Sequence, residues 1–180
     1  MRPRITHSAF IAVLLMISAA PAHGADQGVE VEVIPAGTLG IEVQDLIDFG
    51  RMEVGQSATQ PFVMRILNQT DAGWRVTVDG ADLQGQVLTD PVSTIDSSNL
   101  VVTGGDACFT EACDPAADTM VTPYSVALSG SPVMIMEGTA QASGDFGFGS
   151  PHEPTVQLTI PADAVPNQYA TTLTYTVMAE

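Results

Sequence analysis

Positive charge is what this sequence has least of: the chain contains no lysine, and five arginines stand against 21 acidic residues. Arg2 and Arg4 lie at the start, so from Ala25 onward 21 acidic side chains against three arginines give a net charge of −18. Such a surface repels phosphate backbones and anionic lipid, so we expect neither nucleic acid nor an acidic membrane as a partner. Self-repulsion also favours surroundings with salt or divalent cations, since 0.1 M salt screens charges beyond about 10 Å.

Long hydrophobic runs are also missing, apart from one near the start. Ala9–Ala20 is apolar but too short to cross a bilayer comfortably, and it follows the two early arginines. Ala22 and Gly24 supply small residues three places and one place before a cut at Ala25. This pattern predicts a signal peptide over residues 1–24, with an uncleaved anchor as the alternative. We therefore expect a secreted protein, extracellular or cell-wall associated, with residues 25–180 forming one domain that has no membrane span.

Cysteine is scarce, with only Cys108 and Cys113 in the chain. In an exported protein the two are predicted to form a disulfide, which closes a short loop and contributes about 2 kcal/mol. A zinc site is the weaker alternative, because His152 is the only histidine after the predicted cut and two thiolates do not complete a tetrahedral shell.

No segment shows helical spacing of apolar residues, which argues against parallel α/β architecture. Instead, apolar side chains alternate with polar ones, and Gly, Pro, Asn and Asp separate the alternating segments. The pattern predicts an all-β fold, an antiparallel two-sheet sandwich of Ig-like or Greek-key type. The segments that carry it are Val29–Val33, Leu39–Val43, Phe62–Ile66, Trp74–Val78, Val156–Ile160 and Leu173–Val177.

The middle of the chain is less regular. Leu100–Thr103 is predicted to be a short strand, whereas Pro132–Met136 is apolar on both faces and fits either a central strand or a covered edge. Gly104–Thr122 and Gly138–Pro154 are predicted to be long loops, of the kind that is often functional or mobile.

Catalytic motifs are absent as well. There is no Gly-x-Ser-x-Gly elbow to accompany His152, and no pair of carboxylates stands out for glycoside hydrolysis, so we expect a protein that is not an enzyme. The only cofactor considered is calcium, since hard cations take oxygen ligands from flexible loops. Four acidic residues of one loop are the weak candidates, with a solvated acidic loop as the favoured alternative: Asp106, Glu111, Asp114 and Asp118.

Four segments in a fixed order support a family resemblance. The first three are IPAGTLGI at Ile34–Ile41, DFG at Asp48–Gly50 and GWRVTV at Gly73–Val78, and the last is LTIPADAVPNQYATTLTY at Leu158–Tyr175. Their order and spacing resemble the WxL domain, and the likeness covers most of residues 25–180. That family comprises exported proteins of Gram-positive bacteria that associate non-covalently with the cell wall, apparently through peptidoglycan.

The two motifs that give the family its name are altered here. Val76 stands where the first motif has leucine, and the second reads Tyr175-Thr176-Val177, which keeps a large aromatic and an aliphatic residue. The resemblance makes Trp74, Val76, Tyr175 and Val177 candidate binding residues. Stacking on a sugar requires an exposed ring at Trp74 or Tyr175, whereas the favoured interpretation places both rings in the core and the binding surface elsewhere.

Two hypotheses of function follow. The first is a non-catalytic cell-surface module held by peptidoglycan or by a surface protein. The alternative is a structural subunit of a pilus-like or coat-like assembly that lends or accepts strands, with Asp26–Ile34 as the candidate donor segment.

Overall fold

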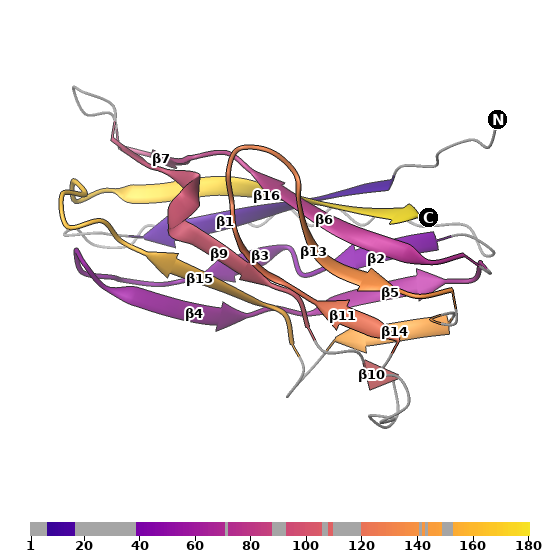
Figure 1. Ribbon diagram of the computed structural model, residues 1–180. Coiled ribbons are helices and arrows are strands. Elements are labelled where there is room, and N and C mark those ends of the chain that lie inside the picture. The colour runs from indigo at the N-terminus through magenta and orange to yellow at the C-terminus, as the bar shows by residue number, and fades with distance from the viewer. Residues whose placement is uncertain are drawn as a thin grey trace.

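The computed structural model describes residues 7–16, 39–70, 72–87, 93–105, 108–109, 120–140, 142, 144–148 and 153–180. Within these ranges the chain is all-β, with one short 3-10 turn, η1 (Ser97–Asn99), and no α-helix (Figure 1). No helix among the described residues is long and apolar enough to cross a membrane. The strands are β1 (His7–Met16), β2 (Leu39–Val43), β3 (Leu46–Asp48), β4 (Ser57–Pro61), β5 (Met64–Asn68), β6 (Trp74–Gly80), β7 (Leu83–Gly85), β8 (Thr94–Ile95), β9 (Leu100–Thr103), β10 (Cys108–Phe109), β11 (Val121–Pro123), β12 (Ser125–Ala127), β13 (Val133–Gly138), β14 (Gly144–Phe148), β15 (Thr155–Thr159) and β16 (Gln168–Ala179).

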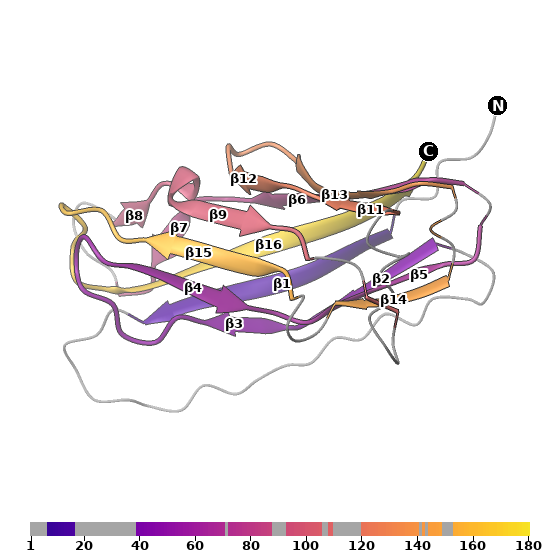
Figure 2. The same ribbon diagram turned by 60° about the horizontal axis from the view of Figure 1, so that its bottom comes forward.

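Three sheets build a sandwich. The largest has the order β11-β13-β6-β16-β1-β3, with β7 paired to β16 and β8 paired to β7. The other two have the orders β10-β14-β5-β2 and β12-β9-β15-β4, and they lie end to end across from the large sheet (Figures 1 and 2). The predicted all-β sandwich is thus confirmed. It differs in detail, because one layer is split in two and β1 pairs with β3 in parallel.

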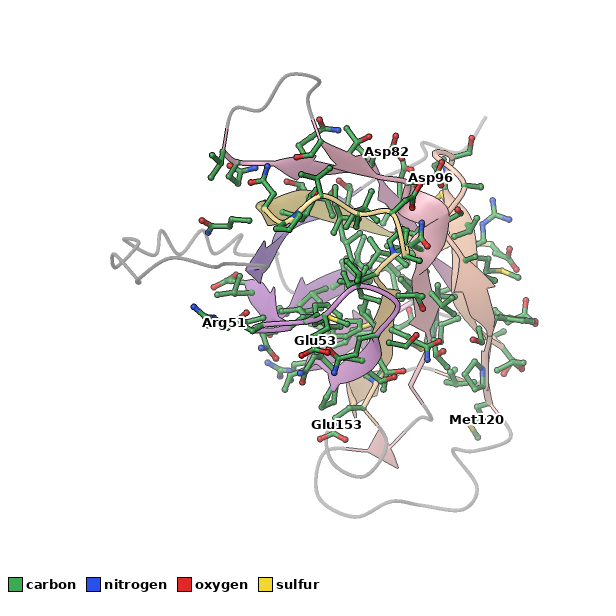
Figure 3. All side chains as sticks on the ribbon, turned by 90° about the vertical axis from the view of Figure 1, so that its left-hand side faces the viewer. Arg51, Glu53, Asp82, Asp96, Met120 and Glu153 are labelled. Atoms are coloured by element: carbon green, nitrogen blue, oxygen red, sulfur yellow. The ribbon has the colours of Figure 1, made fainter. Side chains whose placement is uncertain are left out.

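Alternating side chains create the core. In β6, Trp74, Val76 and Val78 are fully buried while Arg75 between them is exposed, as a strand with one covered face requires. The same alternation buries Val156 and Leu158 in β15. Seen along the strands, side chains from the facing sheets meet in the middle of the molecule (Figure 3).

The apolar segment Pro132–Met136 is part of an inner strand, which decides between the two alternatives that its composition left open. β13 lies between β11 and β6 in the large sheet. Its register against β6 shifts between Met134 and Met136, so the consecutive residues Ile135 and Met136 are both buried. Such an irregularity re-aims side chains, which explains why alternation is lost there.

The long loop predicted over Gly138–Pro154 is partly wrong. It contains β14, which pairs antiparallel with β5 from Gly144↔Asn68 to Phe148↔Met64. The loop predicted over Gly104–Thr122 contains the short strand β10, paired with β14, and it ends in β11. Residues 106–107 and 110–119 of this segment lie outside the described residues.

The first residues of the chain contribute a strand to the large sheet. β1 pairs antiparallel with β16 along ten residues, from His7↔Val177 to Met16↔Gln168, and parallel with β3 from Ala12↔Leu46 to Leu14↔Asp48. The full chain therefore has a strand within residues 1–24, while the signal peptide over residues 1–24 and the domain over residues 25–180 stay predictions. The alternating segment Val29–Val33 lies outside the described residues.

Candidate functional site

The four residues of the altered WxL motifs lie on neighbouring strands and face the core. β6 and β16 pair antiparallel, with Val76 opposite Val177 and Trp74 opposite Ala179. Trp74, Val76, Tyr175 and Val177 each have 0% of their surface exposed. Sugar stacking requires an exposed ring face, so direct binding of a glycan by these residues is excluded in this conformation. The favoured interpretation of Trp74 and Tyr175 as core residues agrees with this burial.

Trp74 is held by a polar and a steric contact. Its indole Nε1 donates a hydrogen bond of 3.0 Å to the backbone oxygen of Ala142. Gly138 lies opposite Trp74 in the β13–β6 ladder, and a Cβ at Gly138 would stand 2.3 Å from Trp74 Cε2. Only glycine leaves room for the indole there, so the buried position of Trp74 depends on a glycine at position 138 of the paired strand.

Two buried tyrosines of β16 differ in how their hydroxyls are satisfied. The Tyr169 hydroxyl donates a hydrogen bond of 2.6 Å to the Val165 carbonyl. The Tyr175 hydroxyl has no hydrogen-bond partner among the described residues, and burial raises the pKa of this phenol. The Tyr175 ring packs against Phe62 at a centroid distance of 5.5 Å and an interplanar angle of 54°.

The predicted calcium and disulfide residues cannot be placed together. Asp106, Glu111, Asp114 and Asp118 lie outside the described residues, as do Cys113 and His152. Among the residues that the structure does describe, no group of three or more His, Cys, Asp or Glu side chains is arranged to hold a metal ion. The disulfide between Cys108 and Cys113 stays a prediction.

Asn68-Gln69-Thr70 matches the Asn-x-Ser/Thr sequon for glycosylation, and its asparagine is buried. Asn68 has 0% exposure, and its Nδ2 donates hydrogen bonds to the carbonyls of Ala142 (2.8 Å) and Ala72 (3.3 Å). Its Oδ1 accepts from the backbone N–H of Thr70 at 3.0 Å. This amide organises the turn between β5 and β6 and is not available to a modifying enzyme in the folded protein.

The acidic character persists at the surface. Arg65 lies 3.3 Å from Glu42 and Arg75 lies 3.3 Å from Glu180, and both pairs are about half exposed. Exposed pairs contribute little to stability. They do neutralise two of the three arginines that follow Ala25, so the remaining carboxylates define the charge that a partner meets.

β1 lies between β16 and β3, at an inner position of the large sheet. β16 pairs with β6 and β7 along one edge and with β1 along the other, and β3 closes the far side of β1. We call this place the acceptor slot and define it by Gln168–Val177 of β16 and by β3. The slot runs the length of β1 through the interior of the sheet (Figure 2).

The side of the acceptor slot that faces the core is apolar. Alternate residues of β16 turn inward there: Tyr169, Leu173, Tyr175 and Val177 have 0% exposure, and Thr171 has 8%. On the other side of the slot, Ile47 of β3 is buried with 2% exposure. Directly opposite residues of an antiparallel pair share a face, so a strand in the slot meets the core at every second position. Sequence reasoning predicted β16 but not this slot, because alternation does not distinguish an inner strand from an edge.

One further side chain escaped the sequence analysis. Asn167 lies just before β16 and is 4% exposed. Its Oδ1 accepts hydrogen bonds from the N–H groups of Val87 (2.9 Å) and Gln168 (2.8 Å). Its Nδ2 donates to the Val87 carbonyl (2.9 Å) and to Ser93 Oγ (2.6 Å). It fixes the strand pair β7–β8 to the start of the acceptor slot. A single asparagine in a Pro-Asn-Gln turn carries no sequence signal for such a role.

Comparisons of the chain with protein-family models, curated proteins and solved structures found no match. The structure therefore assigns a class, an all-β sandwich whose largest sheet includes the first strand of the chain, and no family.

Proposed function

We propose that the protein is an exported, non-catalytic structural subunit of a surface assembly, and that its sandwich is completed by an inserted strand. The position of β1 carries the proposal. β1 lies inside residues 1–24, the segment predicted to be a signal peptide, and it fills an inner position of the large sheet. Removal of that segment on export leaves two strand edges without a partner. Unpaired edges next to apolar side chains are templates for another strand.

Burial of the motif residues supports assembly over direct recognition of a glycan. Trp74, Val76, Tyr175 and Val177 stabilise the two strands that border the acceptor slot or neighbour it, and none reaches the surface. A scaffold of this kind needs a firm β6–β16 pair, since β16 supplies most of the slot.

Amide hydrogen exchange tests the proposal. The full chain made by cell-free translation keeps residues 1–24, whereas the chain exported by a bacterial host with its own leader loses them; mass spectrometry verifies each form. We expect every second amide of β16 in the full chain, those directed toward β1, to be protected from exchange. In exported protein kept dilute they should exchange freely, while the alternate amides that bond β6 stay protected and serve as the internal control. Full protection of both sets in the dilute exported chain would refute the proposal.

Association with the cell wall, which the WxL resemblance implies, is the second proposal, and the surface charge is the observation that bears on it. An anionic protein and an anionic wall need a bridging divalent cation. We expect exported protein to co-sediment with purified peptidoglycan in calcium and to be released by EDTA. No retention in either condition would eliminate wall binding and leave the strand-accepting role unaffected.

A further inference from the structure

The acceptor slot sets requirements that a strand has to meet. Its length is that of β1, ten residues, and its core side calls for an apolar residue at every second position. The intervening positions stand opposite Thr172, Thr174 and Thr176, which are exposed or half-buried, so polar residues fit there. An alternating strand of apolar and polar residues satisfies both sides.

Residues 26–34 of the same sequence carry this pattern over Val29–Val33. Val29, Val31 and Val33 are spaced to share one face, and Glu30 and Glu32 take the other. The segment directly follows the predicted cut at Ala25, so it becomes the new amino-terminal stretch when residues 1–24 leave. Valine is also the residue type that half-buried pleated surfaces favour.

The chain cannot place this segment in its own slot in the orientation of β1. β3 runs parallel to β1, and β2 precedes it at the end of the molecule where β16 finishes (Figure 2). If the donor ends beside Gln168, at the far end of the slot, the chain that follows it has to run back along the full slot to reach Leu39, where β2 begins. Ten strand residues span about 30 Å. Residues 34–38, which join Val33 to Leu39, reach about 20 Å even when fully extended.

We propose that residues 26–34 of a second copy of this chain, nine residues against the ten of β1, fill the acceptor slot, antiparallel to β16 and parallel to β3. The proposal rests on the strand-accepting function and names its partner. Each subunit then accepts a strand from one neighbour and donates its own to the next.

The geometry makes the contact heterologous. The donor's last residues stand beside Gln168 of the acceptor, and the donor's own domain follows within about 20 Å, at its Leu39 end. Two opposite ends of the molecule therefore meet, so the contact does not close on itself as a two-fold dimer does. Repetition of such a contact gives an open filament unless the rotation between copies closes a ring.

Two substitutions in the donor segment separate this proposal from its alternatives. Val31→Glu places a charge on the face that meets the core, whereas Glu32→Gln, the matched control, changes the outward face and keeps the apolar alternation. Both are exported with the leader and purified after processing. Trp74 fluorescence verifies the fold, because a blue-shifted emission requires the buried indole.

Light scattering and electron microscopy at 0.15 M and 1 M salt give the first measurement, and exchange of the β16 amides gives the second. We expect wild type and Glu32→Gln to form filaments with the slot amides protected, and Val31→Glu to remain monomeric with these amides open. Filaments that persist in Val31→Glu would show that another segment is the donor. A wild-type monomer with an open slot would also overturn the second-copy donor, yet leave the strand-accepting function intact. A wild-type monomer whose slot amides are protected would refute both.

Discussion

Replacing Tyr175 with phenylalanine is expected to raise the stability of the protein. The Tyr175 hydroxyl is buried without a hydrogen-bond partner among the described residues, while its ring packs on Phe62. A buried polar group left unsatisfied costs about 1–3 kcal/mol, because it gives up its bonds to water. Phenylalanine keeps the ring and its contacts and removes that cost. We expect a gain of about 1 kcal/mol in the free energy of unfolding.

Tyr169→Phe is the matched control. It is the same change on the same strand, at a residue equally buried, but it removes the 2.6 Å hydrogen bond to the Val165 carbonyl. We expect a loss of about 1 kcal/mol. Urea unfolding followed by Trp74 fluorescence measures both variants, with midpoints compared at an unchanged slope. A loss in Tyr175→Phe as large as that in Tyr169→Phe would show that the Tyr175 hydroxyl has a partner and would refute the reasoning.

Three more predictions use the same unfolding assay. Gly138→Ala should cost about 1–3 kcal/mol, because the new Cβ would stand 2.3 Å from Trp74 Cε2; an unchanged midpoint would contradict this packing. Asn167→Ala should cost about 2–4 kcal/mol through its four lost hydrogen bonds and should speed amide exchange in β7; unaltered exchange there would contradict the clamp. Asp96→Asn should lower stability by its full amount above about pH 4, the ordinary carboxyl range, and by progressively less at lower pH. Hydrogen bonds from the side chain and backbone N–H of Ser98 lower the Asp96 pKa, so the ionised form stabilises the fold at higher pH and this contribution disappears as pH falls through the lowered pKa. Wild-type and Asn curves that stay apart at low pH would contradict that account.

The sequence was sufficient to predict those strands that have one face in the core and the other in solvent. Leu39–Val43, Trp74–Val78 and Leu173–Val177 were predicted as strands because each alternates, and the structure buries the apolar set of each, with Val43 buried in part. The core position of Trp74 followed from the same rule, since its phase matches that of Val76 and Val78. Alternation is a local property of the chain, and a covered face is its direct consequence.

Where pairing depends on distant partners, the sequence was not sufficient. Gly144–Phe148 contains two glycines among its five residues and suggested a loop, yet it forms β14 because β5 and β10 offer hydrogen-bond partners on both sides. Ile135 and Met136 broke the expected alternation because of a register shift that depends on the geometry of β6. The neighbours of β16 were equally hidden, and with them the acceptor slot, since the order of strands in a sheet is set by long-range contacts.

The energetics of the acceptor slot show why its occupant is selected by side chains rather than by backbone. A ladder along a strand contributes roughly 1 kcal/mol per hydrogen bond, while ordering the same residue costs about 1–2 kcal/mol, so the backbone terms nearly cancel. Burial of a valine contributes about 1.5–3 kcal/mol, and three in phase decide the sign. One glutamate at Val31 removes a central valine and places a charge on the core side of the slot, where the neighbouring side chains of β16 are buried and the protein as a whole is already acidic. A glutamine at position 32 changes neither term, which is why the two variants should behave oppositely although they are adjacent.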